Sequence, residues 1–155
     1  MNRFQRLIAA TDLTRVYHLG LEEISAVRDV SLEVLPGQFI AVVGRSGSGK
    51  TTLLNLMAGL DQPTSGTVMF EERDLSTLSE GELTDIRRHK IGFVFQSFGL
   101  LPLLSAFENV ELPLRISGVG PGEREQRTRD ALDMVGLWRR ARHRPYELSG
   151  GEQQR

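Results

Sequence analysis

A glycine-rich segment, GRSGSGKTT from Gly44 to Thr52, constrains the fold of this chain more than any other feature. It follows the run Phe39–Val43, which is apolar on both faces and predicts a strand buried between two layers. It precedes the leucine-rich run Leu53–Met57, which predicts a helix ending at Gly59, a residue suited to the left-handed position after a helix. A strand, a glycine-rich turn and a helix in this order are typical of a parallel α/β sheet.

The spacing Gly44-x-x-x-x-Gly49-Lys50-Thr51 within this context predicts a phosphate-binding loop. Glycines let the backbone approach a phosphate closely, so that successive N–H groups form an anion site at the start of the helix. The Lys50 ammonium is expected to reach the β- and γ-phosphates of a nucleotide, and the Thr51 hydroxyl to bind Mg²⁺. The residues expected to contact the nucleotide here are Gly44, Ser46, Gly47, Ser48, Gly49, Lys50, Thr51 and Thr52. The alternative is a glycine-rich turn that holds no ligand.

The composition excludes several classes of protein. The 155 residues are 39% apolar and 25% charged, which is ordinary for a folded domain. The absence of cysteine excludes a disulfide framework and a thiolate metal site, and a net charge of -1 gives no general attraction to nucleic acid or anionic lipid. No apolar run approaches the ~20 residues needed to cross a bilayer, and the N-terminus lacks the pattern of a signal peptide. We therefore expect a cytoplasmic protein that meets a membrane only through a partner.

The rest of the chain predicts strands that alternate with helices. Polar and apolar residues alternate over Asp29–Val34, which predicts a half-buried strand, and Ile91–Phe95 predicts a second buried one. Three pairs with the pattern S-x-x-E predict helix starts, and these pairs are Ser79–Glu82, Ser105–Glu108 and Ser149–Glu152.

Three further stretches carry a family resemblance. LSGGEQQR, Leu148–Arg155, resembles the signature motif of ABC-type ATPases, and IGFVFQ, Ile91–Gln96, resembles the strand that leads into the family's Q-loop. RVYHLG, Arg15–Gly20, resembles the segment that carries the family's adenine-stacking aromatic residue. The sequence of residues 95–114 resembles that of one branch of the family, which serves lipoprotein release, macrolide or peptide export and cell-division-type transporters. The resemblance covers nearly all of residues 12–155.

The resemblance implies an α/β fold with a P-loop NTPase-type parallel sheet, an antiparallel β subdomain and a helical subdomain, incomplete at the C-terminus. It implies a nucleotide-binding core with the β subdomain at about residues 7–95, a helical subdomain at about 96–147, and the signature motif at 148–155.

The resemblance also implies ATP and Mg²⁺ as ligands and assigns roles to individual residues. Tyr17 is expected to stack on adenine, and Gln96 is expected to contact Mg²⁺ and water, forming the catalytic set with Lys50. Ser149, Gly150 and Gly151 of one subunit are expected to close on the γ-phosphate held by a second, identical subunit arranged head to tail. A simpler interpretation stays open for each of these places. Tyr17 could be a strand aromatic that covers the edge of the core, Gln96 a polar residue that ends a strand, and Ser149 an N-cap.

Transmembrane permease subunits are the other partners that the resemblance implies, which places the protein at the inner face of the plasma membrane. The apolar run Phe98–Leu104 is expected to form either the core of the helical subdomain or a groove for a permease helix. The short basic run Arg139–Arg144 predicts a solvated loop, with no nucleic acid as partner.

The family's Mg²⁺-binding aspartate, water-polarising glutamate and γ-phosphate-contacting histidine follow the signature helix, and the sequence ends at Arg155 before them. We therefore expect the front portion of an ATPase, which alone lacks a cooperative fold and does not hydrolyse ATP. The alternatives are a fragment that binds nucleotide weakly or not at all, and an ABC-type ATPase acting on DNA. The latter often carries very long insertions, for which Gln96 and Ser149 lie too close together.

Overall fold

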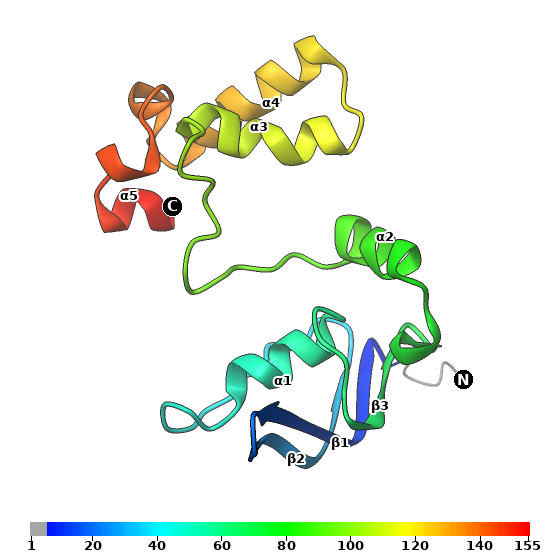
Figure 1. The fold of residues 1–155 in the computed structure, drawn as a ribbon. Helices are drawn as coiled ribbons and strands as arrows, with labels where there is room; N and C mark the ends of the chain where they lie inside the picture. The colour runs from blue at the N-terminus through cyan, green and yellow to red at the C-terminus, as the bar shows by residue number, and fades with distance from the viewer. Residues whose placement is uncertain (1–5) are drawn as a thin grey trace. The chain divides into compact units, whose positions relative to one another are not determined.

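The computed structural model describes residues 6–155, which divide into two compact units, one ending at Gly92 and one spanning Phe93–Arg155. Each unit has its own buried core. Figure 1 shows the ribbon of both units. Within residues 6–155, no helix combines the length and the apolar character that crossing a bilayer requires.

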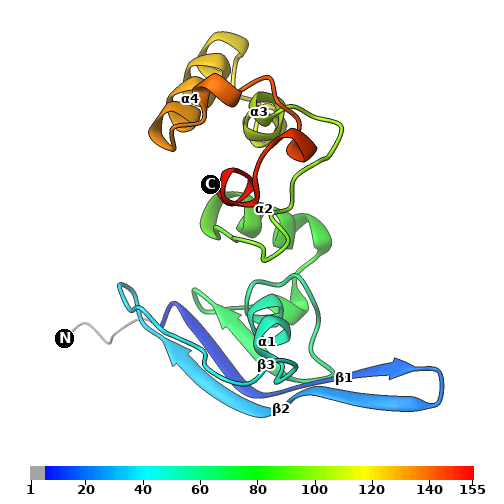
Figure 2. The same cartoon turned by 90° about the vertical axis from the view of Figure 1, so that its left-hand side faces the viewer.

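The first unit contains a four-stranded antiparallel sheet in the order β2-β1-β3-β4. The strands are β1 (Ile8–Leu19), β2 (Glu22–Val34), β3 (Ser65–Phe70) and β4 (Arg73–Asp74), and Figure 2 shows β1 and β2 as a long hairpin. The strand expected at Asp29–Val34 is confirmed as the end of β2. There Val30, Leu32 and Val34 are half-buried and the residues between them are exposed.

Helix α1 (Lys50–Met57) lies on one face of this sheet (Figure 2) and buries Leu53 and Leu56 against it. The predicted helix end at Gly59 is confirmed, since this glycine has a φ of 63° and its N–H donates to the Leu56 carbonyl. The N–H of Leu60 donates to the Asn55 carbonyl, which completes the two hydrogen bonds of a Schellman motif.

A 3₁₀ turn (Leu75–Thr77) and helix α2 (Glu80–Lys90) complete the first unit. The Ser79 hydroxyl accepts from the Glu82 N–H and the Glu82 carboxylate accepts from the Ser79 N–H, as predicted for a capping box. Leu75, Leu83 and Ile86 from these elements belong to the same buried cluster as the core residues of α1 and the sheet.

The two segments predicted as buried strands do not form strands, so these predictions are wrong for the described residues. Phe39–Val43 and Ile91–Phe95 pair with no strand of residues 6–155. Their side chains reach solvent: the exposed fraction is 97% for Phe39, 90% for Val43 and 94% for Val94. A strand of a central sheet needs hydrogen-bonded neighbours, and the antiparallel sheet of the first unit includes neither segment.

The second unit is helical, with α3 (Ala106–Ile116), α4 (Pro121–Met134) and α5 (Gly150–Gln154), and 3₁₀ turns at Trp138–Arg140 and Pro145–Glu147. Its core is made by Ala106, Leu132, Leu137, Ala141 and Leu148. The predicted capping boxes at the starts of α3 and α5 are confirmed.

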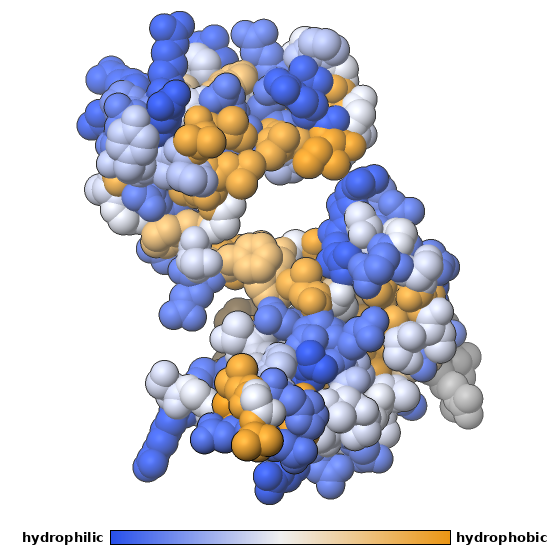
Figure 3. Space-filling model, in the orientation of Figure 1, coloured by the Kyte–Doolittle hydropathy of each residue, from blue (hydrophilic) through white to orange (hydrophobic). Residues whose placement is uncertain are grey.

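The apolar run before α3 does not contribute to this core. Leu101 and Leu103 have exposed fractions of 46% and 79%, and none of the residues from Phe98 to Leu104 belongs to the buried cluster. Apolar side chains reach the surface of both units in Figure 3. The structure therefore does not support the prediction that Phe98–Leu104 forms the core of the helical subdomain.

Candidate functional site

The glycine-rich segment forms an exposed loop that leads directly into α1. Gly47 and Gly49 have φ angles of 79° and 86°, in the left-handed region that other residues rarely adopt. At Gly49 a side chain is also excluded by space, because a Cβ atom there would lie 1.9 Å from the carbonyl oxygen of Ala26 on β2. At Gly49 the loop backbone thus packs directly against β2 of the antiparallel sheet.

The N-terminus of α1 is open to an anion. Gly49 is the N-cap and supplies no side-chain hydrogen bond, and the first turn contains no acidic residue. The first N–H groups of a helix have no partner within the helix, and its N-terminus carries a partial positive charge. Such an end is suited to phosphate.

Lys50 adds a full positive charge at this place. Its Nζ donates to the carbonyl oxygens of Gly44 and Arg45 at 3.0 and 2.7 Å, and lies 3.4 Å from the Ser48 hydroxyl. The ammonium group therefore stays on the loop at its N-terminal end. The contact of Lys50 with phosphate stays a prediction.

The hydroxyl residues of the loop are placed for polar contacts with a bound group. Ser46, Ser48 and Thr51 are exposed and Thr52 is half-buried. Across residues 6–155 there is no group of three His, Asp or Glu side chains that could hold a metal ion. Mg²⁺ commonly takes one or two protein oxygens and completes its shell with phosphate oxygens and water, so the Thr51 hydroxyl fits as a single protein ligand beside a triphosphate.

Tyr17, on β1, belongs to a network with two residues that the sequence analysis did not single out. Its hydroxyl donates to Oδ2 of Asp61 at 2.7 Å, and the Arg15 guanidinium lies 4.5 Å from the centre of its ring. Arg15 donates to both carboxylate oxygens of Asp61, at 3.0 and 2.8 Å. Arg15 could have been noticed, because residues two apart on a strand share a face. No sequence pattern connects Asp61 with Tyr17 in this way.

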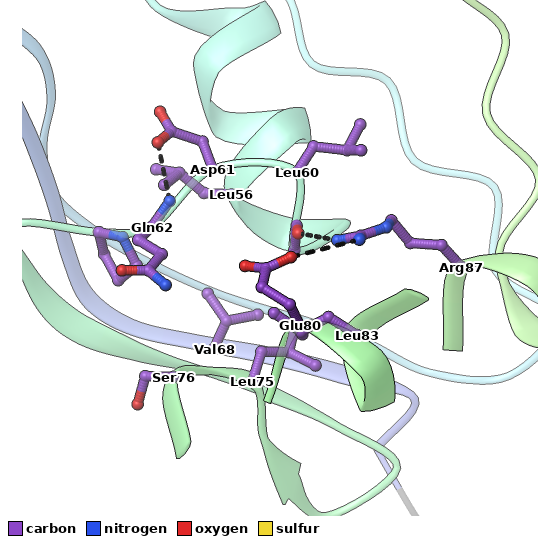
Figure 4. Close-up of a pocket in the computed structure, with 12 residues that line it drawn as sticks. Leu56, Leu60, Asp61, Gln62, Val68, Leu75, Ser76, Glu80, Leu83 and Arg87 are labelled. Atoms are coloured by element: carbon purple, nitrogen blue, oxygen red, sulfur yellow. Dashed lines mark hydrogen bonds and ion pairs between the residues drawn. The ribbon is translucent and has the colours of Figure 1, made fainter. Parts of the chain in front are cut away.

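The Asp61 carboxylate accepts hydrogen bonds from several donors. The N–H of Gln62 also donates to its Oδ1, at 2.8 Å (Figure 4). Burial by itself would raise the pKa of Asp61. The hydrogen bonds from Tyr17 and from the Gln62 N–H, with the charge of Arg15, outweigh it and lower this pKa below its ordinary value. Asp61 is therefore an anion at neutral pH.

The remaining predicted residues lie in the second unit. Gln96 is exposed, in a turn that follows the contact between the Phe93 and Phe95 rings. The Ser149 hydroxyl accepts from the Glu152 N–H at 3.3 Å, which confirms the simpler reading of Ser149 as an N-cap. The backbone of Gly150 and Gly151 is exposed, with no atom near the place of a Cβ.

A further residue of the signature motif holds its turn together. The Gln153 side-chain amide donates to the carbonyl oxygens of Pro145 and Leu148, at 2.8 and 3.0 Å. These bonds fix the segment that precedes α5 while the start of α5 stays accessible. The structure thus brings Arg15, Tyr17 and Asp61 together, and Lys50 with its loop, whereas Gln96 and the signature motif belong to the other unit.

Comparison with known proteins identifies the family. The family model described as "ABC transporter" matches residues 27–155. An uncharacterized ABC transporter ATP-binding protein of Thermotoga maritima is 46% identical over 151 residues, which are 97% of this chain and 64% of that protein. A macrolide export ATP-binding/permease protein MacB of Marinobacter nauticus is 46% identical over 149 residues, 96% of this chain and 23% of that protein.

A solved structure shares the fold. The ATP-binding cassette MJ0796, in a dimeric post-hydrolysis state bound to ADP and Pi, superposes with a TM-score of 0.87 at 46% identity. The match covers 95% of this chain and 65% of the cassette, a protein of Methanocaldococcus jannaschii. The expected fold class is thereby confirmed. The chain spans 64–65% of the length of the Thermotoga maritima protein and of the cassette, and 23% of the length of MacB. With a family model matched over most of its length and relatives of this identity, the chain belongs to the ABC transporter ATP-binding family.

Proposed function

We propose that the chain is the ATP-binding motor part of an ABC transporter that exports a macrolide, lipoprotein or peptide. The observation that carries the proposal is the open N-terminus of α1, where left-handed glycines and the Lys50 ammonium meet without a competing acid. These groups supply N–H donors and positive charge for the β- and γ-phosphates of ATP. ATP hydrolysis is the activity of the family.

Each residue of the first unit's site has a role in this proposal. The loop N–H groups and the hydroxyls of Ser46, Ser48 and Thr52 hold the phosphates, and Thr51 supplies an oxygen to Mg²⁺. The metal, when bound, offsets negative charge that develops between the phosphates. The Tyr17 ring stacks on adenine. Gln96 contacts the metal and the attacking water.

The signature motif acts on a second copy of the chain. Ser149, Gly150 and Gly151 present a hydroxyl and exposed backbone at the start of α5, which is suited to a phosphate oxygen. In a head-to-tail dimer the signature of each copy faces the phosphate loop of the other, so that two equal sites form about a two-fold axis. The similar cassette MJ0796 is dimeric in its solved structures, which supports the dimer in this proposal.

A permease is the membrane partner in this proposal, and it holds the protein at the inner face of the plasma membrane. Support comes from relatives named as ATP-binding/permease proteins for macrolide and pyoverdine export, which are 46% and 45% identical to this chain. The near-neutral net charge of -1 gives no support to a role on DNA.

We further propose that residues 1–155 on their own bind nucleotide through the first unit, which has its own buried core, and do not hydrolyse it. The lack of one cooperative fold across all of residues 1–155 stays a prediction. Lys50, Thr51 and Gln96 are among them, but the glutamate that polarises water in the family is not. A side chain that orients the attacking water is one of the requirements for phosphoryl transfer to water.

Calorimetric titration of the chain with Mg-ATP tests the proposal. Lys50→Ala is expected to weaken binding at least about tenfold, since a charge-assisted contact contributes roughly 1.5–3 kcal/mol. Lys90→Ala is the matched control, because Lys90 pairs only with Glu71 at the surface among its described ion pairs. Equal affinities of the wild-type and Lys50→Ala chains would contradict a phosphate loop. Phosphate release by the wild-type chain would contradict the proposed inactivity of these residues alone.

A further inference from the structure

The Asp61 carboxylate collects four donors on two oxygens. Oδ2 accepts from the Tyr17 hydroxyl at 2.7 Å and from Nε of Arg15 at 3.0 Å. Oδ1 accepts from Nη2 of Arg15 at 2.8 Å and from the Gln62 N–H at 2.8 Å. Asp61 follows the end of α1, at the rim of a pocket on the first unit (Figure 4), whereas Tyr17 and Arg15 lie on β1.

These contacts fix the aromatic ring of Tyr17 in two ways. The hydroxyl bond holds the far end of the side chain, and the Arg15 guanidinium, 4.5 Å from the ring centre, covers one face. Arg15 is itself held by a two-pronged bond to Asp61, and the side chains of Arg15 and Asp61 are only 24% and 22% exposed. Planar forked pairs of this kind restrict both partners. The Arg15 guanidinium therefore blocks one face of the Tyr17 ring to a flat ligand.

We propose that Asp61 and Arg15 are positioning residues for the nucleobase, which set the Tyr17 ring at the angle that stacking on adenine requires. The proposal rests on the proposed function, because it takes Tyr17 as the residue that contacts the base. Asp61 and Arg15 act through Tyr17 and make no contact with the phosphates. Their effect should appear only with ligands that carry a base.

Two ligands separate this role from a general effect on stability. ATP has a base and a triphosphate, whereas tripolyphosphate has the phosphates alone. Stacking of a base on an aromatic side chain contributes enough that its loss weakens binding by about tenfold or more. If the Tyr17 ring is present but no longer held in one orientation, part of the affinity that comes from base stacking should be lost.

The experiment compares calorimetric titrations of residues 1–155 with Mg-ATP and with Mg-tripolyphosphate. Asp61→Asn leaves one acceptor oxygen for four donors and is expected to weaken ATP binding about five- to tenfold, with tripolyphosphate unchanged. Tyr17→Phe keeps the ring, removes the hydroxyl tether alone, and is expected to give a smaller loss of the same kind. Asp85→Asn is the control, because the Asp85 side chain is 69% exposed and pairs at 3.7 Å with Arg88 on the same helix.

Each result decides the question. A loss for ATP alone in Asp61→Asn and Tyr17→Phe supports the proposal. Equal losses for both ligands, or no loss for either, overturn it. If the wild-type chain binds both ligands equally, the phosphate loop stands and the base-positioning role falls. If the wild-type chain binds neither ligand, the proposed function fails and this inference fails with it.

Discussion

The guanidinium of Arg87 on α2 donates a hydrogen bond to the carbonyl oxygen of Gly59, just beyond the end of α1. Arg87 also donates to the Thr84 hydroxyl at 3.0 Å and lies 3.7 Å from the Glu80 carboxylate. A cation at a helix C-terminus interacts favourably with the helix dipole. Arg87 thus joins α2 to the helix that begins at the phosphate loop.

Replacing this arginine should destabilise the first unit. Arg87→Ala is expected to lower the free energy of unfolding by about 1–2 kcal/mol, because a partly buried hydrogen bond and a dipole contact are lost together. Urea unfolding followed by circular dichroism measures the change. Arg88→Ala serves as the control, since within residues 6–155 Arg88 makes only a 3.7 Å pair with Asp85. A surface change of this kind contributes less than about 0.5 kcal/mol. Equal effects of the two substitutions would contradict the role of Arg87.

The two left-handed loop glycines should differ in their response to alanine. Gly47→Ala adds only backbone strain of about 1–2 kcal/mol, because a Cβ there meets no atom within 4 Å. Gly49→Ala adds the same strain and also drives a Cβ into the Ala26 carbonyl, so that the loop must move away from β2. We expect Gly49→Ala to lower the thermal midpoint more and to abolish Mg-ATP binding. Identical melting curves for the two variants would show that the loop does not pack against β2 as described.

Acid should weaken the start of α3 through Glu108. Hydrogen bonds from the Ser105 hydroxyl and N–H, outweighing a smaller opposing effect of burial and helped by the Arg144 and Arg115 charges, lower the Glu108 pKa below 4.5. A carboxyl with a lowered pKa in the folded state stabilises it above the unfolded-state pKa, and this stabilisation is lost as pH falls through the folded-state pKa.

The comparison of Glu108→Gln with the wild-type chain checks this sign. Glutamine can keep the capping box without titrating. Thermal midpoints measured from neutral pH downward should therefore fall less steeply in Glu108→Gln below the ordinary glutamate pKa. A parallel fall in both chains would assign the acid sensitivity to other carboxyls, such as Glu82 and Glu152, whose pKa values are also lowered.

The exposed run Phe39–Val43 should make the isolated chain prone to aggregation. Phe39 and Val43 are almost fully exposed, and an unpaired apolar segment of this kind is a template for pairing between chains. Val43→Lys is expected to reduce light scattering at a given concentration and to lower the binding of a hydrophobic dye. Leu54→Lys is the comparison, since Leu54 is exposed on a formed helix. No difference between Val43→Lys and the wild-type chain would contradict this expectation.

Features that depend on a few neighbouring residues could be predicted from the sequence. The capping boxes at Ser79, Ser105 and Ser149, and the helix end at Gly59, follow from side chains within four positions of one another. The glycine-rich loop before α1 is local in the same sense, and Gly47 and Gly49 have left-handed backbone angles. Its contact with phosphate stays a prediction.

Features that depend on distant residues could not be predicted in this way. The apolar pattern of Phe39–Val43 is typical of a buried strand. A strand also needs a hydrogen-bonded neighbour, however, and no segment of residues 6–155 pairs with this one. The sequence pattern predicts a role for Tyr17 but not for its partner Asp61, because Asp61 lies 44 positions away and no spacing rule connects the two. The burial of Glu111, held by Arg124 at 2.7 Å, depends in the same way on how α3 packs on α4.

The shortness of α1 has a mechanical consequence. A helix of eight residues extends about 12 Å and is too short to bend appreciably. Its first end abuts the Ala26 carbonyl through Gly49, and its last end meets Arg87 through Gly59. It is therefore a short rigid element: a tilt at its Gly49 end would move Gly59, and with it the neighbouring Asp61, by a comparable amount.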